Sequence, residues 1–226
     1  MTLADRSIQG ARHVSYAAEM VDGLEVVVGT WVARHPRLLQ RVEEAFELAR
    51  EHCSTLLDAR DVDVHVMAAP DECIPQWGTG GFTQGPHAVL VAVDPDHDVQ
   101  TDHLISTLVH EIHHAMRWRG PGCGTSLGER LVSEGLAEAF EVQCTGREPL
   151  YAVGQVEAAA RAAARRALAE DPADEGRWFF GSADVPFWFG YRWGYELVNE
   201  ALPRLGLTAA EAVLVPAADV LAAGRA

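Results

Sequence analysis

Residues 110–114 spell HEIHH, a pattern whose residue types and spacing suit metal-dependent hydrolysis. In a helix, residues four apart lie on one face, so His110 and His114 can direct two imidazoles at one metal ion. Glu111 adjoins the first histidine. Zinc lowers the pKa of a bound water toward ~7, and a carboxylate at this position can take the proton from that water. Because three fixed residues also arise by chance, the pattern needs support from its surroundings.

That support comes from a second acidic segment, SEGLAEAFE, which follows the histidines. A catalytic zinc takes three protein ligands and keeps one open position. Glu134 lies twenty residues after His114 and is predicted to be the third ligand. Glu138, one turn further on, is predicted to accept a hydrogen bond from the other ring nitrogen of a zinc-binding histidine. The alternative is that both glutamates form the solvated face of an amphipathic helix, but their position on the helix after HExxH favours the metal site.

Two tyrosines further along the chain are candidates for stabilising an oxyanion. Tyr191 and Tyr195 lie four residues apart in GYRWGYEL and share one face of a predicted helix. A hydroxyl that donates a hydrogen bond to the developing negative charge would assist peptide hydrolysis. The alternative is that this aromatic face packs in the core.

Periodicity of the apolar residues predicts the elements that carry these groups. The predicted strands cover residues 24–31, 62–67 and 88–93, and a glycine-rich stretch, residues 78–85, leads into the third. One predicted helix begins at Pro36, and four more cover residues 101–118, 126–142, 153–170 and 186–205. A last helix is predicted from Thr208, because the spacing from Thr208 to Glu211 is that of a capping box. Residues 174–186 are predicted to be a loop carrying Trp178, Phe179 and Phe180.

The overall charge limits the kinds of partner. The 226 residues include 33 Asp and Glu against 18 Lys and Arg, a formal net charge of −15. Phosphate backbones and anionic membranes attract basic surfaces, so neither nucleic acid nor a membrane surface is expected as a partner. The apolar runs are too short to span a bilayer, and the first twenty residues lack the pattern of a signal peptide.

The cysteines indicate a reducing compartment. Cys53, Cys73, Cys123 and Cys144 are scattered and form no CxxC pair. We therefore expect free thiols, no cysteine-ligated metal and a cytoplasmic location.

The motifs also resemble those of a known family. HEIHHAMR followed by SEGLAEAFE is similar to the bacterial family of predicted zinc-dependent proteases, within the gluzincins. The resemblance extends from Val62 to the end of the chain and includes the segments VPFWFGYRWGYELV and LVPAADVL. It implies a gluzincin fold, a Zn²⁺ cofactor and hydrolysis of peptide bonds, and it implies that Tyr191 lies near the site.

The expected fold is α+β and zincin-like, with one domain over residues 1–226. Residues 1–100 would form a lobe with a helix and a small mixed sheet that has an antiparallel edge strand, and residues 101–226 a helical lobe that carries the metal site. Ala88–Val93 is predicted to be the edge strand beside the cleft, where a peptide would pair by main-chain hydrogen bonds and where Gly80 and Gly81 would allow close approach. The alternative is that this strand is buried, since its residues are apolar on both faces.

The predicted function is therefore a zinc peptidase with a peptide or protein substrate. One alternative keeps the metal but acts on a small molecule or modified peptide, as a hydrolase or lyase. Another is a catalytically idle binding protein with the same fold, which the presence of Glu111 argues against. The predicted substrate-pairing edge and the aromatic residues 178–180 favour the peptidase over the first alternative.

Overall fold

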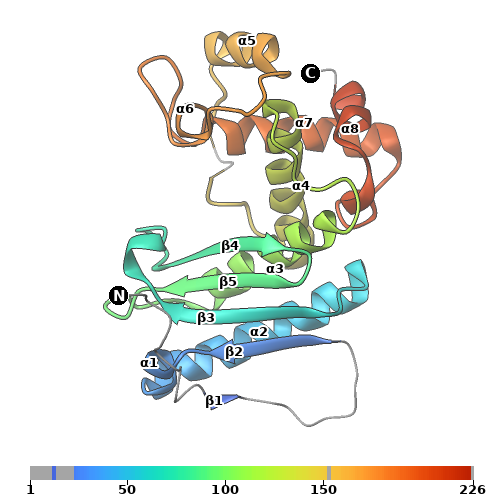
Figure 1. Cartoon of the computed structure of the whole chain (residues 1–226). Helices are drawn as coiled ribbons and strands as arrows, with labels where there is room; N and C mark the ends of the chain where they lie inside the picture. The colour runs from blue at the N-terminus through green and yellow to red at the C-terminus, as the bar shows by residue number, and fades with distance from the viewer. Residues whose placement is uncertain (1–11, 14–22, 152–153, 225–226) are drawn as a thin grey trace, which may run out of the picture.

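The computed structural model describes residues 12–13, 23–151 and 154–224. The stretch tested for a signal peptide lies almost entirely outside them. The fold is α+β, as predicted: a mixed sheet near the amino terminus precedes a mostly helical remainder (Figure 1). None of the described helices is long and apolar enough to cross a membrane. All four cysteines are free thiols, as expected.

The sheet has the strand order β1-β2-β3-β5-β4. The strands are β1 Arg12–His13, β2 Leu24–Val28, β3 Val62–Ala68, β4 Thr79–Gly85 and β5 Ala88–Val93. The three strands β2, β3 and β5 run parallel, and β1 and β4 pair antiparallel at the two edges. Alternate valines of β3 are buried while Asp63 between them is exposed, so one face of this strand packs into the core.

The identity of the edge strand differs from the prediction. β5 (Ala88–Val93) lies between β3 and β4 and is an interior strand, as its apolar residues on both faces allow. The strand at this edge of the sheet is β4, TGGFTQG, whose sequence reads only as a glycine-rich stretch. Glycine is depleted in strands and this segment lacks apolar alternation, so no pattern indicated a strand there.

Helices make up most of the rest of the chain. The helices that lie between the strands of the sheet are α1 Thr30–Ala33, α2 Pro36–Leu57 and the 3₁₀ turn η1 Pro70–Glu72. The following ones are α3 Thr101–Trp118, α4 Leu127–Thr145, α5 Ala158–Ala167, α6 Glu175–Phe179, α7 Phe189–Leu205, η2 Glu211–Leu214 and α8 Ala217–Gly224. α3 contacts α2, β4 and α4, so it joins the sheet to the helical part (Figure 1).

Several predicted boundaries need correction. The first strand ends at Val28, and α1 follows at once. The predicted loop 174–186 contains the short helix α6. The predicted helix 153–170 begins outside the described residues at Val153, and its described part is helical only from Ala158. Thr208 and Glu211 do bond each other as in a capping box, but only a 3₁₀ turn follows. Pro216 explains this, because the residue before a proline favours extended backbone, which Val215 adopts.

The start of α4 is fixed by a complete capping box. The Ser126 hydroxyl accepts a hydrogen bond from the backbone N–H of Glu129, and the Glu129 carboxylate accepts one from the backbone N–H of Ser126. This reciprocal cap fixes the residue at which the helix that carries Glu134 begins.

α4 and α7 cross at a pair of glycines. A side chain added at Gly135 would collide with the backbone carbonyl of Gly194, and one added at Gly194 would collide with the carbonyl of Leu131. Neither obstacle is a flexible side-chain end that could move aside. The close approach brings Tyr191 of α7 toward Glu134 of α4.

We expect Gly135→Ala to lower the free energy of unfolding by about 1–3 kcal/mol, because the two helices must separate to admit the methyl group. Gly176→Ala is the matched control: it is also helical, but its methyl group would meet nothing closer than 3.4 Å, so it should be neutral or slightly stabilising. Chemical denaturation of both variants measures the difference. Equal stability of the two variants would contradict the close crossing.

Candidate metal centre

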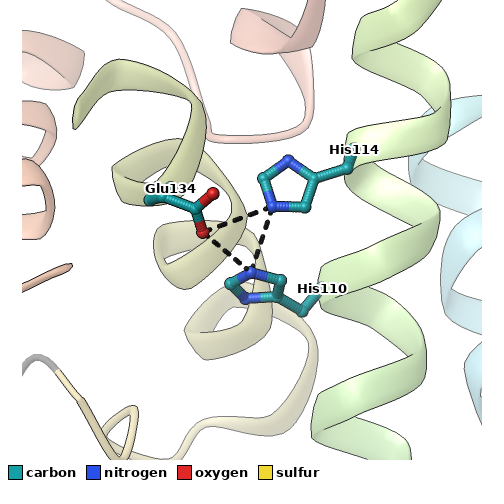
Figure 2. A group of neighbouring side chains, drawn as sticks. All are labelled: His110, His114 and Glu134. Carbon is teal, nitrogen blue, oxygen red and sulfur yellow. Dashed lines mark hydrogen bonds and ion pairs between the residues drawn. The ribbon is translucent and has the colours of Figure 1, made fainter. Parts of the chain in front are cut away.

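Three side chains from α3 and α4 converge on one point. The Nε2 atoms of His110 and His114 lie 3.2 Å apart, and Glu134 Oε2 lies 3.4 Å from each of them (Figure 2). Zinc bonds of about 2.0–2.1 Å in tetrahedral geometry place neighbouring ligand atoms ~3.3 Å apart. The three atoms therefore match one face of a zinc tetrahedron, with the fourth position left for water or substrate.

Glu111 lies beside this triad and is held in place by β4. Its side chain lines the same cavity and is almost fully buried. The Thr83 hydroxyl lies 2.7 Å from Glu111 Oε2 and 2.8 Å from the Glu111 carbonyl oxygen. Gly81 leaves the space that the Glu111 side chain fills, since a side chain there would collide with it. The carboxylate is thus fixed between the edge strand and the metal triad.

A cavity of about 440 Å³ opens over these groups. His110, Glu111, His114 and Glu134 all line it, together with residues of β4 and of the segments around α6 and α7. This volume is within the range of small-molecule and substrate sites.

The comparison with protein families agrees with this geometry. The model of a family described as "Predicted Zn-dependent protease (DUF2268)" matches residues 40–222. The chain belongs to this family. The resemblance found in the sequence is confirmed, and the cofactor is Zn²⁺, for which the triad supplies the ligand types and spacing. Neither the curated proteins nor the solved structures gave a match.

In this member of the family, each histidine of the triad has a further neighbour at its second ring nitrogen. His114 Nδ1 lies 3.1 Å from the Ser133 hydroxyl and 3.8 Å from Cys123 Sγ. His110 Nδ1 lies 3.9 Å from Glu141 Oε2. The Ser133 contact is within hydrogen-bond distance and can fix the orientation of the His114 ring, whereas the Glu141 contact with His110 is longer and electrostatic.

Glu138 does not occupy the position predicted for it. It is fully buried, and neither carboxylate oxygen has a hydrogen-bond partner among the described residues. Ser133 and Glu141, which the sequence analysis did not select, lie at the ring nitrogens instead. Burial and then the neighbouring Glu141 raise the pKa of Glu138 well above its ordinary value, because the charged form is disfavoured in this environment.

The triad is electrostatically coupled. Burial alone would raise the pKa of Glu134, but His114 and His110 hold that pKa well below its usual range. Burial alone would lower the pKa of His114, yet the Glu134 carboxylate and Cys123 raise it. A carboxylate held ionised beside two imidazoles is a donor set that suits zinc.

The two predicted tyrosines are placed differently. Tyr191 lines the cavity, whereas Tyr195 is not among its lining residues. Tyr151, on the segment after α4, was missed by the sequence analysis because no periodic pattern marks that segment. It also lines the cavity, and its ring stacks on Tyr191 at 4.6 Å between centroids. Burial and then nearby carboxylates raise the pKa of both Tyr151 and Tyr191, so both hydroxyls keep their protons and can donate hydrogen bonds.

The contact between Thr83 and Glu111 gives a testable expectation. Thr83→Val removes the hydroxyl at nearly constant shape, so Glu111 loses a hydrogen bond while the triad is untouched. We expect kcat to fall by about 10- to 100-fold, since a hydrogen bond to a charged group contributes about 1.5–3 kcal/mol. Thr83→Ser keeps the hydroxyl and should retain most activity. Equal activity of the two variants on one peptide substrate would show that the hydroxyl does not position Glu111.

Proposed function

We propose that this chain is a gluzincin-type peptidase, in which His110, His114 and Glu134 hold one Zn²⁺ and Glu111 is the general base. The observation that carries the proposal is the position of the Glu111 carboxylate. It lines the same cavity as the three candidate ligands, is not one of them, and is fixed by Thr83. A base held beside a metal but not bound to it is the arrangement that water activation requires.

Bound zinc supplies two effects at such a site: it polarises the carbonyl of the substrate and lowers the pKa of water toward ~7. Glu111 accepts a proton from the attacking water and can pass it to the departing amine. The Tyr191 hydroxyl, which keeps its proton, donates a hydrogen bond to the oxyanion. Tyr195 does not line the cavity, so we propose Tyr191 for this role.

The edge strand supports a peptide as substrate. Among the described residues no strand pairs with the outer side of β4, where only an isolated bridge from Ile74 meets Thr79, and β4 lines the cavity through Gly81 to Thr83. A peptide can add to such an edge by main-chain hydrogen bonds, which a small molecule cannot do. This observation favours a peptidase over a small-molecule hydrolase or lyase. The fixed Glu111 carboxylate favours an enzyme over an idle binding protein.

The direct test is incubation of the zinc-loaded protein with a diverse peptide library, with cleavage detected by mass spectrometry. We expect cleavage that stops when zinc is removed by a chelator and resumes when zinc is added back. A library left intact by the zinc-loaded protein would contradict the peptidase and favour one of the two alternatives. Binding of a shared ligand without turnover, by both the wild type and Glu111→Gln, would specifically support the idle binding protein.

A further inference from the structure

The metal triad lies in the middle of a groove. The cavity over the triad is lined by residues of α3 from Ser106 to Trp118, and His110 and His114 lie between these ends. At a rise of 1.5 Å per residue, this part of α3 is ~18 Å long. An extended peptide rises about 3.3 Å per residue, so the groove is long enough for about five or six residues.

The groove continues beyond Ser106 into a second cavity of about 540 Å³. The two cavities share Trp77, Ser106 and Glu141 in their linings, so they are neighbours along α3. The second cavity extends to the amino-terminal end of α3, where Asp102 and Arg147 line it. Space for substrate therefore exists on both sides of the metal triad.

Both ends of this groove are exposed to solvent. At the end nearest Trp118, the side chains of Trp118 and Phe180 are 44% and 57% exposed. At the other end, Arg147 and Asp102 have side chains that are 43% and 61% exposed. The groove is therefore lined by solvent-exposed side chains at both of its ends.

The two arginines of the groove are already engaged by carboxylates, so neither is free to bind the α-carboxylate of a substrate. An exopeptidase binds the α-ammonium or α-carboxylate of its substrate through an oppositely charged group near the metal. The two arginines that line the cavities are each already paired, Arg130 with Glu175 and Arg147 with Asp102. Glu141 is almost fully buried and lies against the ring of His110. A substrate whose termini lie outside the groove fits these pairings best.

The end near Trp118 is apolar and close to the reacting groups. Trp118 follows Glu111 by seven residues, so both share one face of α3. Phe180, the residue that follows α6, lines the same cavity from a separate segment of the chain. Large exposed apolar side chains that converge on one cavity mark a binding surface.

We propose that the chain is an endopeptidase that binds an extended, unfolded stretch of about six residues across the metal site, with a bulky apolar side chain between Trp118 and Phe180. This inference rests on the proposed peptidase function and specifies its substrate class. Main-chain pairing with β4 would hold the stretch extended, and the two aromatic side chains would select among sequences.

The test compares peptides with blocked and free ends, using the full zinc-loaded chain. The first series contains peptides of four, six and eight residues whose termini are acetylated and amidated. Each peptide carries a fluorophore and a quencher on inner side chains, and a phenylalanine is placed at each position in turn. A second series has the same sequences with free termini, and a third contains aminoacyl and carboxy-terminal dipeptide substrates. We expect blocked six- and eight-residue peptides to be cleaved internally as fast as free ones, and kcat/KM to rise about 10-fold or more from four residues to six.

Cleavage that requires a free amino or carboxyl terminus would overturn the endopeptidase inference while leaving the peptidase function intact. Loss of such terminus-dependent cleavage in Glu141→Gln would then identify Glu141 as the group that binds an α-ammonium. Failure to cleave any of the three series would instead contradict the proposed function itself.

Variants test the apolar end separately. We expect Trp118→Ala to lower kcat/KM about 10-fold for the best phenylalanine-containing peptide and to leave its alanine counterpart unchanged, because only the former loses a side-chain contact. Phe180→Ala should act in the same direction and serves if Trp118→Ala folds poorly. Phe187→Ala is the control, since Phe187 is equally exposed but does not line the cavity. The assignment would be overturned if Trp118→Ala and Phe180→Ala lowered kcat/KM as much for the alanine peptide as for the phenylalanine peptide. It would also be overturned if neither variant changed kcat/KM for either peptide.

Discussion

Glu111→Gln is expected to lower peptide hydrolysis by about 10²–10⁴-fold while zinc stays bound, the range for loss of a general base. The amide is nearly the same size as the carboxylate and can still lie beside Thr83, but it cannot accept the proton of the attacking water. The triad atoms belong to other residues, so metal content should be unchanged. Steady-state kinetics and metal analysis on the same preparation measure both effects, and KM should change little.

Glu175→Gln provides the matched control for this substitution. Glu175 also lines the cavity but pairs with Arg130, away from the triad. Its replacement by the same amide should change kcat by much less than Glu111→Gln does. Near-full activity in Glu111→Gln would mean that the chain does not use the proposed mechanism, whatever its fold.

His110→Ala and His114→Ala should each lose zinc and, with it, all activity above the uncatalysed background. Either substitution leaves only two of the three candidate ligand atoms, and two ligands hold the ion poorly. The variants should be purified side by side, and zinc should be measured per chain by elemental analysis, with an expected value near one for the wild type.

His103→Ala is the control for metal loss, because His103 lies on the same helix but stacks on Trp77 outside the triad. It should keep its zinc. Stoichiometric zinc in both His110→Ala and His114→Ala would show that the ligands lie elsewhere.

The parts of the site that could be predicted are those fixed by local spacing. His110 and His114 converge because residues four apart in a helix share a face, which holds whatever the helix packs against. Glu134 was selected because it lies on the next helix at a suitable distance along the chain. The structure brings its carboxylate to 3.4 Å from both histidines because α4 packs against α3.

The groups that the sequence missed depend on how elements pack together. Whether Glu138, Ser133 or Glu141 meets a histidine ring is decided by the rotation of α4 against α3, which periodicity within one helix does not contain. Thr83 and Gly81 act through a strand whose glycines and polar residues gave no apolar alternation. Tyr151 stands outside the helices, so only the folded chain brings it to Tyr191.

The most direct test of the metal site is a crystal structure of the zinc-loaded protein, with the metal located by anomalous scattering. We expect one zinc about 2 Å from His110 Nε2, His114 Nε2 and an oxygen of Glu134. We expect Glu111 and Tyr191 nearby but not bound to it. A structure in which Glu134 faces solvent, or in which Glu129 or Glu138 binds the metal in its place, would contradict this ligand set.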